Sequence, residues 1–116
     1  MDTHSIADQL VGFLTRRQFT AAVRALYARD VESRENAGPP TRGFDAVLAD
    51  NERWVRENAI ARFEVAGCYV DGDAIVLEMI SDFTHTPTGR VIHSEEAGVY
   101  RVRDGKIVST RFYYGY

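Results

Sequence analysis

The second half of the chain decides the fold: residues 60–114 read IARFEVAGCYVDGDAIVLEMISDFTHTPTGRVIHSEEAGVYRVRDGKIVSTRFYY. Apolar and β-branched residues dominate four segments, 60–70, 74–85, 91–102 and 107–114. Turns that contain glycine separate these segments at 71–72, 87–89 and 103–105. Since glycine supplies the positive φ that tight hairpins need, the pattern predicts a meander of antiparallel strands. Strands this long must twist and curl, and a curled sheet needs something to enclose.

The first half of the chain predicts that filling, as three short amphipathic helices over 5–15, 17–27 and 43–58. A short extended segment, 30–36, follows the second helix. The run Gly38-Pro39-Pro40 must be a loop, because proline fixes φ and lacks a backbone donor. Helices followed by an antiparallel sheet are typical of the α+β class. We therefore expect a cone-shaped barrel, in which a curved antiparallel sheet wraps around the N-terminal helices and leaves a cavity at the open end.

The bulk composition favours one domain spanning 1–116. The 116 residues are 45% hydrophobic and 27% charged, with a formal net charge of −3, which is ordinary for a globular protein. The Lys and Arg residues are scattered, so no nucleic-acid partner is expected. No stretch has the composition of a signal peptide or a membrane span, and Cys68 is the only cysteine. We therefore expect a cytoplasmic protein without membrane association.

Hairpin geometry predicts which side chains face the cavity. A three-residue loop at 87–89 places Asp82 opposite Ser94 and Ile80 opposite Glu96. One sheet face then carries the acids Glu78, Asp82 and Glu96 together with Tyr100, Phe112 and Tyr114, and we expect that face to line the cavity. An error of one residue in a turn would exchange the two faces of a strand.

The opposite sheet face would expose Leu77, Met79, Phe83 and Val99. An exposed apolar patch of this size is typical of an interaction surface. We therefore expect a homodimer that forms through the outer face of the sheet. The alternative is a surface with scattered, unpartnered apolar residues.

Three stretches resemble the nuclear transport factor 2-like superfamily, and its SnoaL-like and ketosteroid-isomerase-like branches in particular. They are Leu26-Tyr27-Ala28-Arg29-Asp30, Arg42-Gly43-Phe44-Asp45-Ala46-Val47, and Asp104-Gly105-Lys106-Ile107-Val108 with Phe112-Tyr113-Tyr114. The resemblance covers nearly the whole chain and implies the cone-shaped α+β fold. The superfamily contains isomerases, cyclases, epoxide hydrolases, dehydratases and domains that only bind, so the fold leaves the function open.

The resemblance makes Glu35 a candidate general base. In ketosteroid isomerases a Tyr-Ala-Asp-Asp segment is followed by the catalytic aspartate, and here Tyr27-Ala28-Arg29-Asp30 is followed at the corresponding distance by Glu35. A carboxylate at the mouth of an apolar cone has its charged form disfavoured, which raises its pKa. The alternative is a solvated carboxylate that pairs with Arg34 or Arg42.

The chain also departs from these families. The isomerases stabilise their intermediate with a tyrosine and a protonated aspartic acid, and those positions fall at Val11 and Gly98, which have no donor. Classical steroid isomerisation is therefore not expected. SnoaL-like cyclases use a histidine and an aspartate. His85 resembles that histidine, but the aspartate again falls near Gly98 or Val99.

Glu78, Asp82 and Glu96 form a second candidate centre, because crowded carboxyl groups share protons and so supply an acid and a base. There are two alternatives. One strand has its two faces exchanged, so that its acids point away from the cavity, or arginines such as Arg62 and Arg111 neutralise these acids. The expected ligand-binding residues are Trp54, Glu78, Tyr100, Phe112 and Tyr114. No metal site and no cofactor are expected.

Two functions remain open. The first is a small cofactor-independent isomerase, cyclase or dehydratase that acts on a hydrophobic small molecule, with Glu35 as the base and Glu96 or Asp82 as the acid. The second is a non-catalytic, dimeric domain for ligand binding or assembly.

Overall fold

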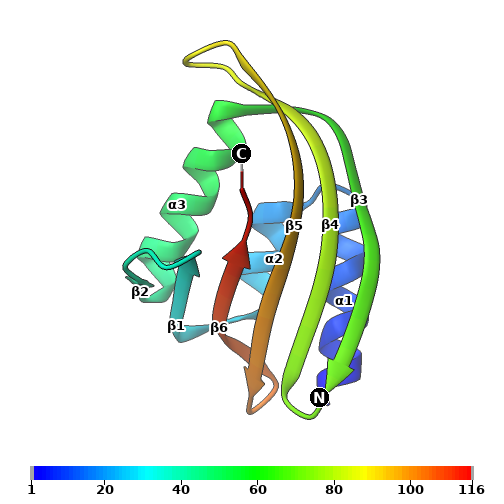
Figure 1. The fold of residues 1–116 in the computed structure, drawn as a ribbon. Helices are drawn as coiled ribbons and strands as arrows, with labels where there is room; N and C mark the ends of the chain where they lie inside the picture. The colour runs from blue at the N-terminus through cyan, green and yellow to red at the C-terminus, as the bar shows by residue number, and fades with distance from the viewer. Residues whose placement is uncertain (1, 116) are drawn as a thin grey trace.

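The chain folds into helices that lie against one curved sheet. The computed structural model describes residues 2–115. Six strands form the sheet in the order β2-β1-β6-β5-β4-β3 (Figure 1). The predicted α+β class and order of elements are confirmed. The elements are α1 (Thr3–Thr15), α2 (Phe19–Leu26), β1 (Tyr27–Glu35), β2 (Thr41–Arg42), α3 (Phe44–Glu57), β3 (Asn58–Asp71), β4 (Ala74–His85), β5 (Arg90–Arg103) and β6 (Lys106–Tyr113).

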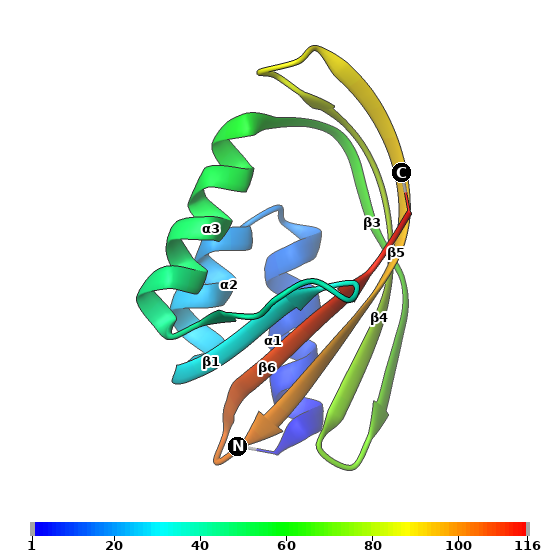
Figure 2. The ribbon, with the colours of Figure 1, turned by 60° about the vertical axis from the view of Figure 1, so that its left-hand side comes forward.

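The three helices cover the concave side of the sheet, as Figure 2 shows. Asp2 is the N-cap of helix α1, and its side chain accepts a hydrogen bond from the Ser5 N–H (2.8 Å). Its buried face, formed by Ile6 and Leu10, packs into the same core as Leu77 and Ile107 of the sheet. Burial of this apolar surface is the main force that bends the sheet around the helices, and it confirms the predicted wrapping.

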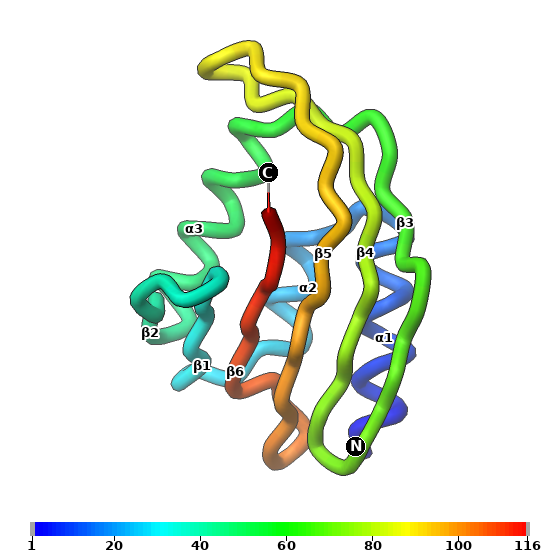
Figure 3. Tube along the Cα trace, in the orientation of Figure 1, coloured from blue at the N-terminus to red at the C-terminus, as the bar shows by residue number. Residues whose placement is uncertain are grey.

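The sheet is mixed and open rather than an antiparallel barrel. Strand β1 runs parallel to β6, and the two lie side by side although α3 and four strands separate them in sequence (Figure 3). Within residues 2–115, β2 and β3 are the two edges of the sheet, so it does not close. The hairpin pattern predicted only the antiparallel pairs, because a parallel pair depends on a long connection that carries no turn signal.

The turn between β4 and β5 is one residue longer than expected. His85 pairs with Arg90, so the loop holds four residues, and the Gly89 N–H donates to the His85 carbonyl at 2.8 Å. Gly89 has φ 73°, the left-handed conformation that its position predicts. The added residue shifts the register, so Asp82 lies opposite His93.

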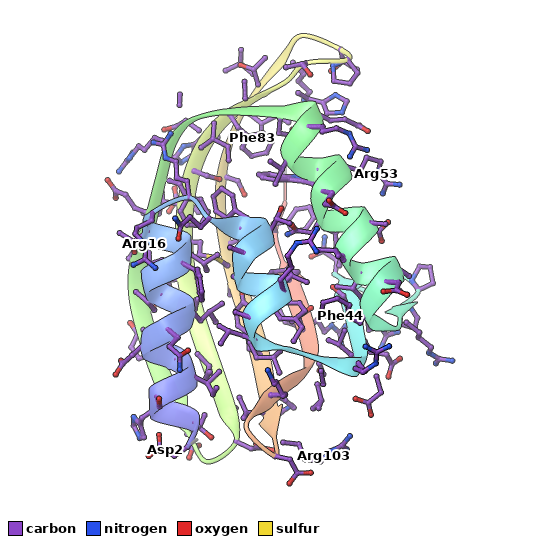
Figure 4. All side chains as sticks on the ribbon, turned by 180° about the vertical axis from the view of Figure 1, so that it is seen from behind. Asp2, Arg16, Phe44, Arg53, Phe83 and Arg103 are labelled. Atoms are coloured by element: carbon purple, nitrogen blue, oxygen red, sulfur yellow. The ribbon has the colours of Figure 1, made fainter. Side chains whose placement is uncertain are left out.

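This shift exchanges the two faces of β4. Leu77, Met79 and Phe83 face the helices and are buried, and Figure 4 shows Phe83 on the helix side of the sheet, close to α3. Glu78 and Asp82 lie on the outer face. The prediction that these two acids line the cavity is therefore wrong, and so is the outer apolar patch of Leu77, Met79 and Phe83. Burying the apolar set rather than the acids is the arrangement of lower free energy.

The faces of β5 and β6 are as predicted. Tyr100 pairs with Thr110 and Gly98 with Phe112. The expected partners were Val108 for Tyr100 and Thr110 for Gly98, so the register differs by two residues. Because side chains alternate with a period of two, this difference leaves the faces unchanged.

Candidate functional site

A cavity of about 690 Å³ lies between the concave side of the sheet and the helices. This volume falls in the range of small-molecule sites. Its walls are mostly aromatic and aliphatic, and the rings contact one another edge to face: Trp54 and Phe83 have centroids 5.5 Å apart, and Phe19 and Phe63 5.0 Å. The apolar and aromatic side chains of the wall include Phe19, Val23, Tyr27, Trp54, Phe63, Met79, Phe83, Ile92, Tyr100 and Phe112.

Glu96 is one of the carboxyl side chains that line the cavity, together with Glu35, Asp50 and Glu57. It faces inward from β5, opposite Met79. Burial, and then the negative charge of Glu35, raise the pKa of Glu96 to about 7. A carboxyl with this pKa exists in comparable amounts of both protonation states near neutral pH, which suits it to move protons.

Neither arginine expected to neutralise the acids lines the cavity. Arg62 lies on the outer side of the sheet, where it donates to Glu64 at 3.1 Å and its Nη1 lies 3.8 Å from Asp82 Oδ2. Arg111 Nε donates to the Asn36 carbonyl at 3.0 Å. Arg53 of α3 does line the cavity, but its Nη2 lies 3.3 Å from Asp50 Oδ1. The charge of Glu96 is therefore moderated by a proton rather than by an arginine, in accord with its raised pKa.

Glu35 stands at the rim of the cavity, at the end of β1. It pairs with Phe112 of β6, lines the cavity and is exposed. The next residue, Asn36, joins the two strand ends: its N–H donates to the Phe112 carbonyl (2.7 Å), and its Oδ1 accepts from the Tyr114 N–H (2.9 Å). These bonds hold Glu35 and Tyr114 at one end of the cavity.

The arginines considered as partners for Glu35 bind other groups. Arg42 Nε donates to Glu32 Oε1 at 3.0 Å, and Arg34 Nε donates to the Gly38 carbonyl at 3.2 Å. Glu35 is nevertheless exposed to solvent, which agrees with the alternative interpretation of the sequence. Its negative charge acts on the site through the raised pKa of Glu96.

Two tyrosines accompany Glu96. Burial raises the pKa of Tyr27 and the pKa of Tyr100, and the charges of Tyr27 and Glu96 raise that of Tyr100 further. Both phenols therefore stay protonated at neutral pH and keep a hydroxyl that can donate a hydrogen bond. Tyr27, at the end of the predicted second helix, was not among the residues expected to line the cavity.

The structure brings six of the eight predicted site residues to the cavity: Glu35, Trp54, Glu96, Tyr100, Phe112 and Tyr114. Glu78 and Asp82 are excluded by the orientation of β4. Asp82 Oδ1 lies 2.7 Å from His93 Nδ1 on the outer face, and Glu78 is exposed. The catalytic and binding roles of the six remain predictions.

His85 lines the cavity beside the hairpin turn, where it was expected to be a surface residue. It is partly buried, its Nδ1 lies 2.9 Å from Thr88 Oγ1, and its Nε2 lies 3.7 Å from Glu57 Oε2. These contacts fix the ring near the end of α3.

Gly98 occupies the place of the isomerases' acid, and it leaves no room for one. A Cβ at Gly98 would lie 2.9 Å from Met79 Cε and 3.0 Å from Tyr100 Cε1. Val11, the other such position, is partly buried against the core.

The described residues contain neither a candidate metal site nor a candidate membrane-spanning helix. Residues 2–115 contain no group of three or more His, Cys, Asp or Glu side chains placed to hold a metal ion. Of the helices described, none has the length and apolar character to cross a membrane.

The comparison with protein families decides the relationship. The model of the SnoaL-like domain family matches residues 7–110. The chain belongs to the SnoaL-like domain family. This SnoaL-like domain is similar to a Mesorhizobium loti protein, provisionally described as a SnoaL-like polyketide cyclase, with 31% identity and a TM-score of 0.92. The match covers 98% of this chain and 100% of that one. The superfamily predicted from the sequence is confirmed.

More distant structures share the fold alone. An LEH-like epoxide hydrolase of Mycobacterium tuberculosis is 20% identical, with a TM-score of 0.76 over 96% of this chain and 84% of that one. A Catenulispora acidiphila protein with a ketosteroid isomerase-like fold, in complex with trimethylamine, is 18% identical, with a TM-score of 0.76 over 95% and 85%. A search of curated proteins finds no match.

Proposed function

We propose that this SnoaL-like domain binds a small hydrophobic ketone in its cavity and isomerises it by moving a proton, without a cofactor. The observation that carries the proposal is the position of Glu96, a carboxyl with a pKa of about 7 on the wall of an apolar cavity. A group that titrates at neutral pH both accepts and returns a proton readily. Glu96 takes the base role that the sequence gave to Glu35.

The reaction begins with ionised Glu96. Its carboxylate removes a proton from the carbon that lies between the ketone and a C=C double bond of the substrate, and the electron pair of the broken C–H bond is delocalised onto the carbonyl oxygen as a dienolate. The protonated Glu96 then returns the proton to another carbon of the conjugated system. The double bond has moved, the carboxylate is restored, and no other reactant is consumed.

The enolate oxygen needs hydrogen-bond donors, because its charge develops in a cavity poor in water. Tyr27 and Tyr100 supply candidate hydroxyls, since burial keeps both protonated. They would replace the two hydrogen-bond donors of the ketosteroid isomerases, whose positions in this sequence correspond to Val11 and Gly98. Glu35 remains at the rim, where its charge supports the high pKa of Glu96.

Hydrogen exchange on β-tetralone, a fused bicyclic ketone with acidic C–H bonds, tests the proposal. In heavy water, NMR is expected to show that the protein speeds deuterium incorporation next to the carbonyl, and that Glu96→Gln lowers this rate by about a hundredfold or more. Glu78→Gln, on the outer face, is expected to keep the full rate. Exchange no faster than in buffer, or an unimpaired Glu96→Gln variant, would refute it.

A non-catalytic binding domain is the second candidate, and Gly98 favours it because that position has no donor. In that case Trp54 fluorescence would respond to β-tetralone while the exchange rate stayed at that of buffer. The two functions thus differ in one measurement on the same complex.

A further inference from the structure

Ser94 is a buried hydroxyl that the fold leaves without a partner. It faces the cavity from β5, opposite Ser81 of β4, and is 2% exposed. Among the buried side-chain nitrogen and oxygen atoms of residues 2–115, the Ser94 Oγ is the one that has no hydrogen bond. A buried hydroxyl without a partner is less favourable than the same group in water, so its position calls for an explanation.

Thr110 shows how the same sheet treats a comparable hydroxyl. It is also 2% exposed, on the neighbouring strand β6, and its Oγ1 donates to Ser33 Oγ at 2.8 Å. The fold therefore satisfies one buried hydroxyl internally and leaves the other directed at the cavity. A hydroxyl that served only the fold would be expected to resemble Thr110.

Along the two strands, the neighbours of the serine pair on the cavity face are apolar except for Glu96. Toward the hairpin turn, the next pair is Phe83 and Ile92; in the opposite direction, the next pair is Met79 and Glu96. Ser94 and Glu96 are two residues apart on one face of β5, which places their Cα atoms about 7 Å apart. From Phe83 to Met79 on β4 and from Ile92 to Glu96 on β5, the wall thus presents two polar points, the serine pair and Glu96, among apolar side chains.

We propose that Ser94, with Ser81 beside it, binds a hydroxyl or carbonyl oxygen at the end of the ligand remote from the group on which Glu96 acts. The ligand is then a hydrophobic molecule that carries oxygen atoms at two positions. This inference rests on the proposed function, and it adds the substrate class and the orientation of the ligand.

Two matched ketones test the assignment. They are β-tetralone and its derivative with a hydroxyl group on the aromatic ring, at the end opposite the ketone. Calorimetry is expected to show that the protein binds the hydroxylated ketone about tenfold more tightly, the effect of one hydrogen bond. Ser94→Ala is expected to bind both ketones equally, with its affinity for β-tetralone within about twofold of wild type.

The melting temperature distinguishes a ligand-binding serine from a structural one, because replacing a structural serine lowers it. Ser94→Ala removes an unpartnered hydroxyl, so its melting temperature is expected to equal or exceed that of wild type. Thr110→Val, the control, removes a made hydrogen bond and is expected to lower it. A Ser94→Ala variant as destabilised as Thr110→Val would overturn the inference, because its hydroxyl would then serve the fold.

The outcomes separate the inference from the function on which it rests. If the wild-type protein binds neither ketone, the proposed function and the inference both fall. If it binds both equally, or if Ser94→Ala keeps the preference for the hydroxylated ketone, the inference falls while the proposed function stands.

Discussion

Glu96 and Glu35 are electrostatically coupled across the cavity: burial raises the pKa of Glu96 to about 7, and the negative charge of Glu35 contributes to the rise. One carboxyl is on the wall and the other is exposed at the rim. In the proposed reaction, the buried carboxyl is the one that transfers the proton.

The coupling predicts that stability falls as the pH rises. Between the ordinary carboxyl pKa of 4.5 and about 7, Glu96 holds its proton in the folded protein but loses it in the unfolded chain. The folded state is therefore favoured at low pH, and this contribution, about 3 kcal/mol, is lost once the pH exceeds about 7. Urea unfolding should show that Glu96→Gln exceeds wild type by about that amount at about pH 8 but not at about pH 5.

Glu78→Gln is the control for this pH dependence, because Glu78 is an exposed carboxyl on the outer face of the adjacent strand. It should follow the wild-type curve at both pH values. If Glu96→Gln also followed that curve, Glu96 would not be the titrating group.

Neutralising the rim charge should lower the pKa of Glu96. Glu35→Gln removes a nearby negative charge that disfavours ionisation of Glu96, so less of the carboxyl stays protonated at neutral pH. NMR titration of the Glu96 carboxyl carbon measures the change. Because Glu35 is exposed, high salt should screen its charge and produce part of the same shift in the wild-type protein. An unchanged titration in the variant would show that burial alone sets the pKa.

Gly98→Ala should destabilise the fold by about 1 kcal/mol through overpacking. Its Cβ would lie within 3.0 Å of both Met79 Cε and Tyr100 Cε1, so the side chains must shift. Gly12→Ala in α1 is the contrasting variant, because its Cβ meets only the Arg16 side chain, and alanine is expected to gain about 0.5–1 kcal/mol there. Equal changes in both variants, measured by urea unfolding, would contradict the argument.

The homodimer remains a prediction; of the outer-face residues first expected, Val99 remains, and Val76 and Ile80 replace the others. No helix among the described residues covers the outer face of the sheet (Figure 2), where Val76, Ile80 and Val99 lie partly exposed. Sedimentation velocity should show a dimer that Val99→Asp converts to a monomer, since a charge in an apolar interface is unfavourable. Val91→Asp, which alters a residue 78% exposed near the hairpin turn, should leave it a dimer. A monomeric wild-type protein would refute the prediction.

The orientation of β4 was within reach of the sequence. Leu77, Met79 and Phe83 alternate with Glu78 and Asp82, and this alternation alone favours burial of the apolar set. The prediction relied instead on the length of the turn at 87–89, which Thr86-Pro87-Thr88-Gly89 does not specify. A loop of three or four residues is compatible with the same glycine, so local turn chemistry left the register open.

The sequence by itself determined the strands, their hairpins and the helices beneath them, because these depend on local rules: the period of apolar residues and the positive φ of Gly72, Gly89 and Gly105. Only the tertiary structure decided that β1 pairs with β6, that Tyr27 lines the cavity, and that Ser94 Oγ lacks a hydrogen-bond partner. Those features depend on which groups lose contact with water, and that loss is a sum over residues distant in the chain.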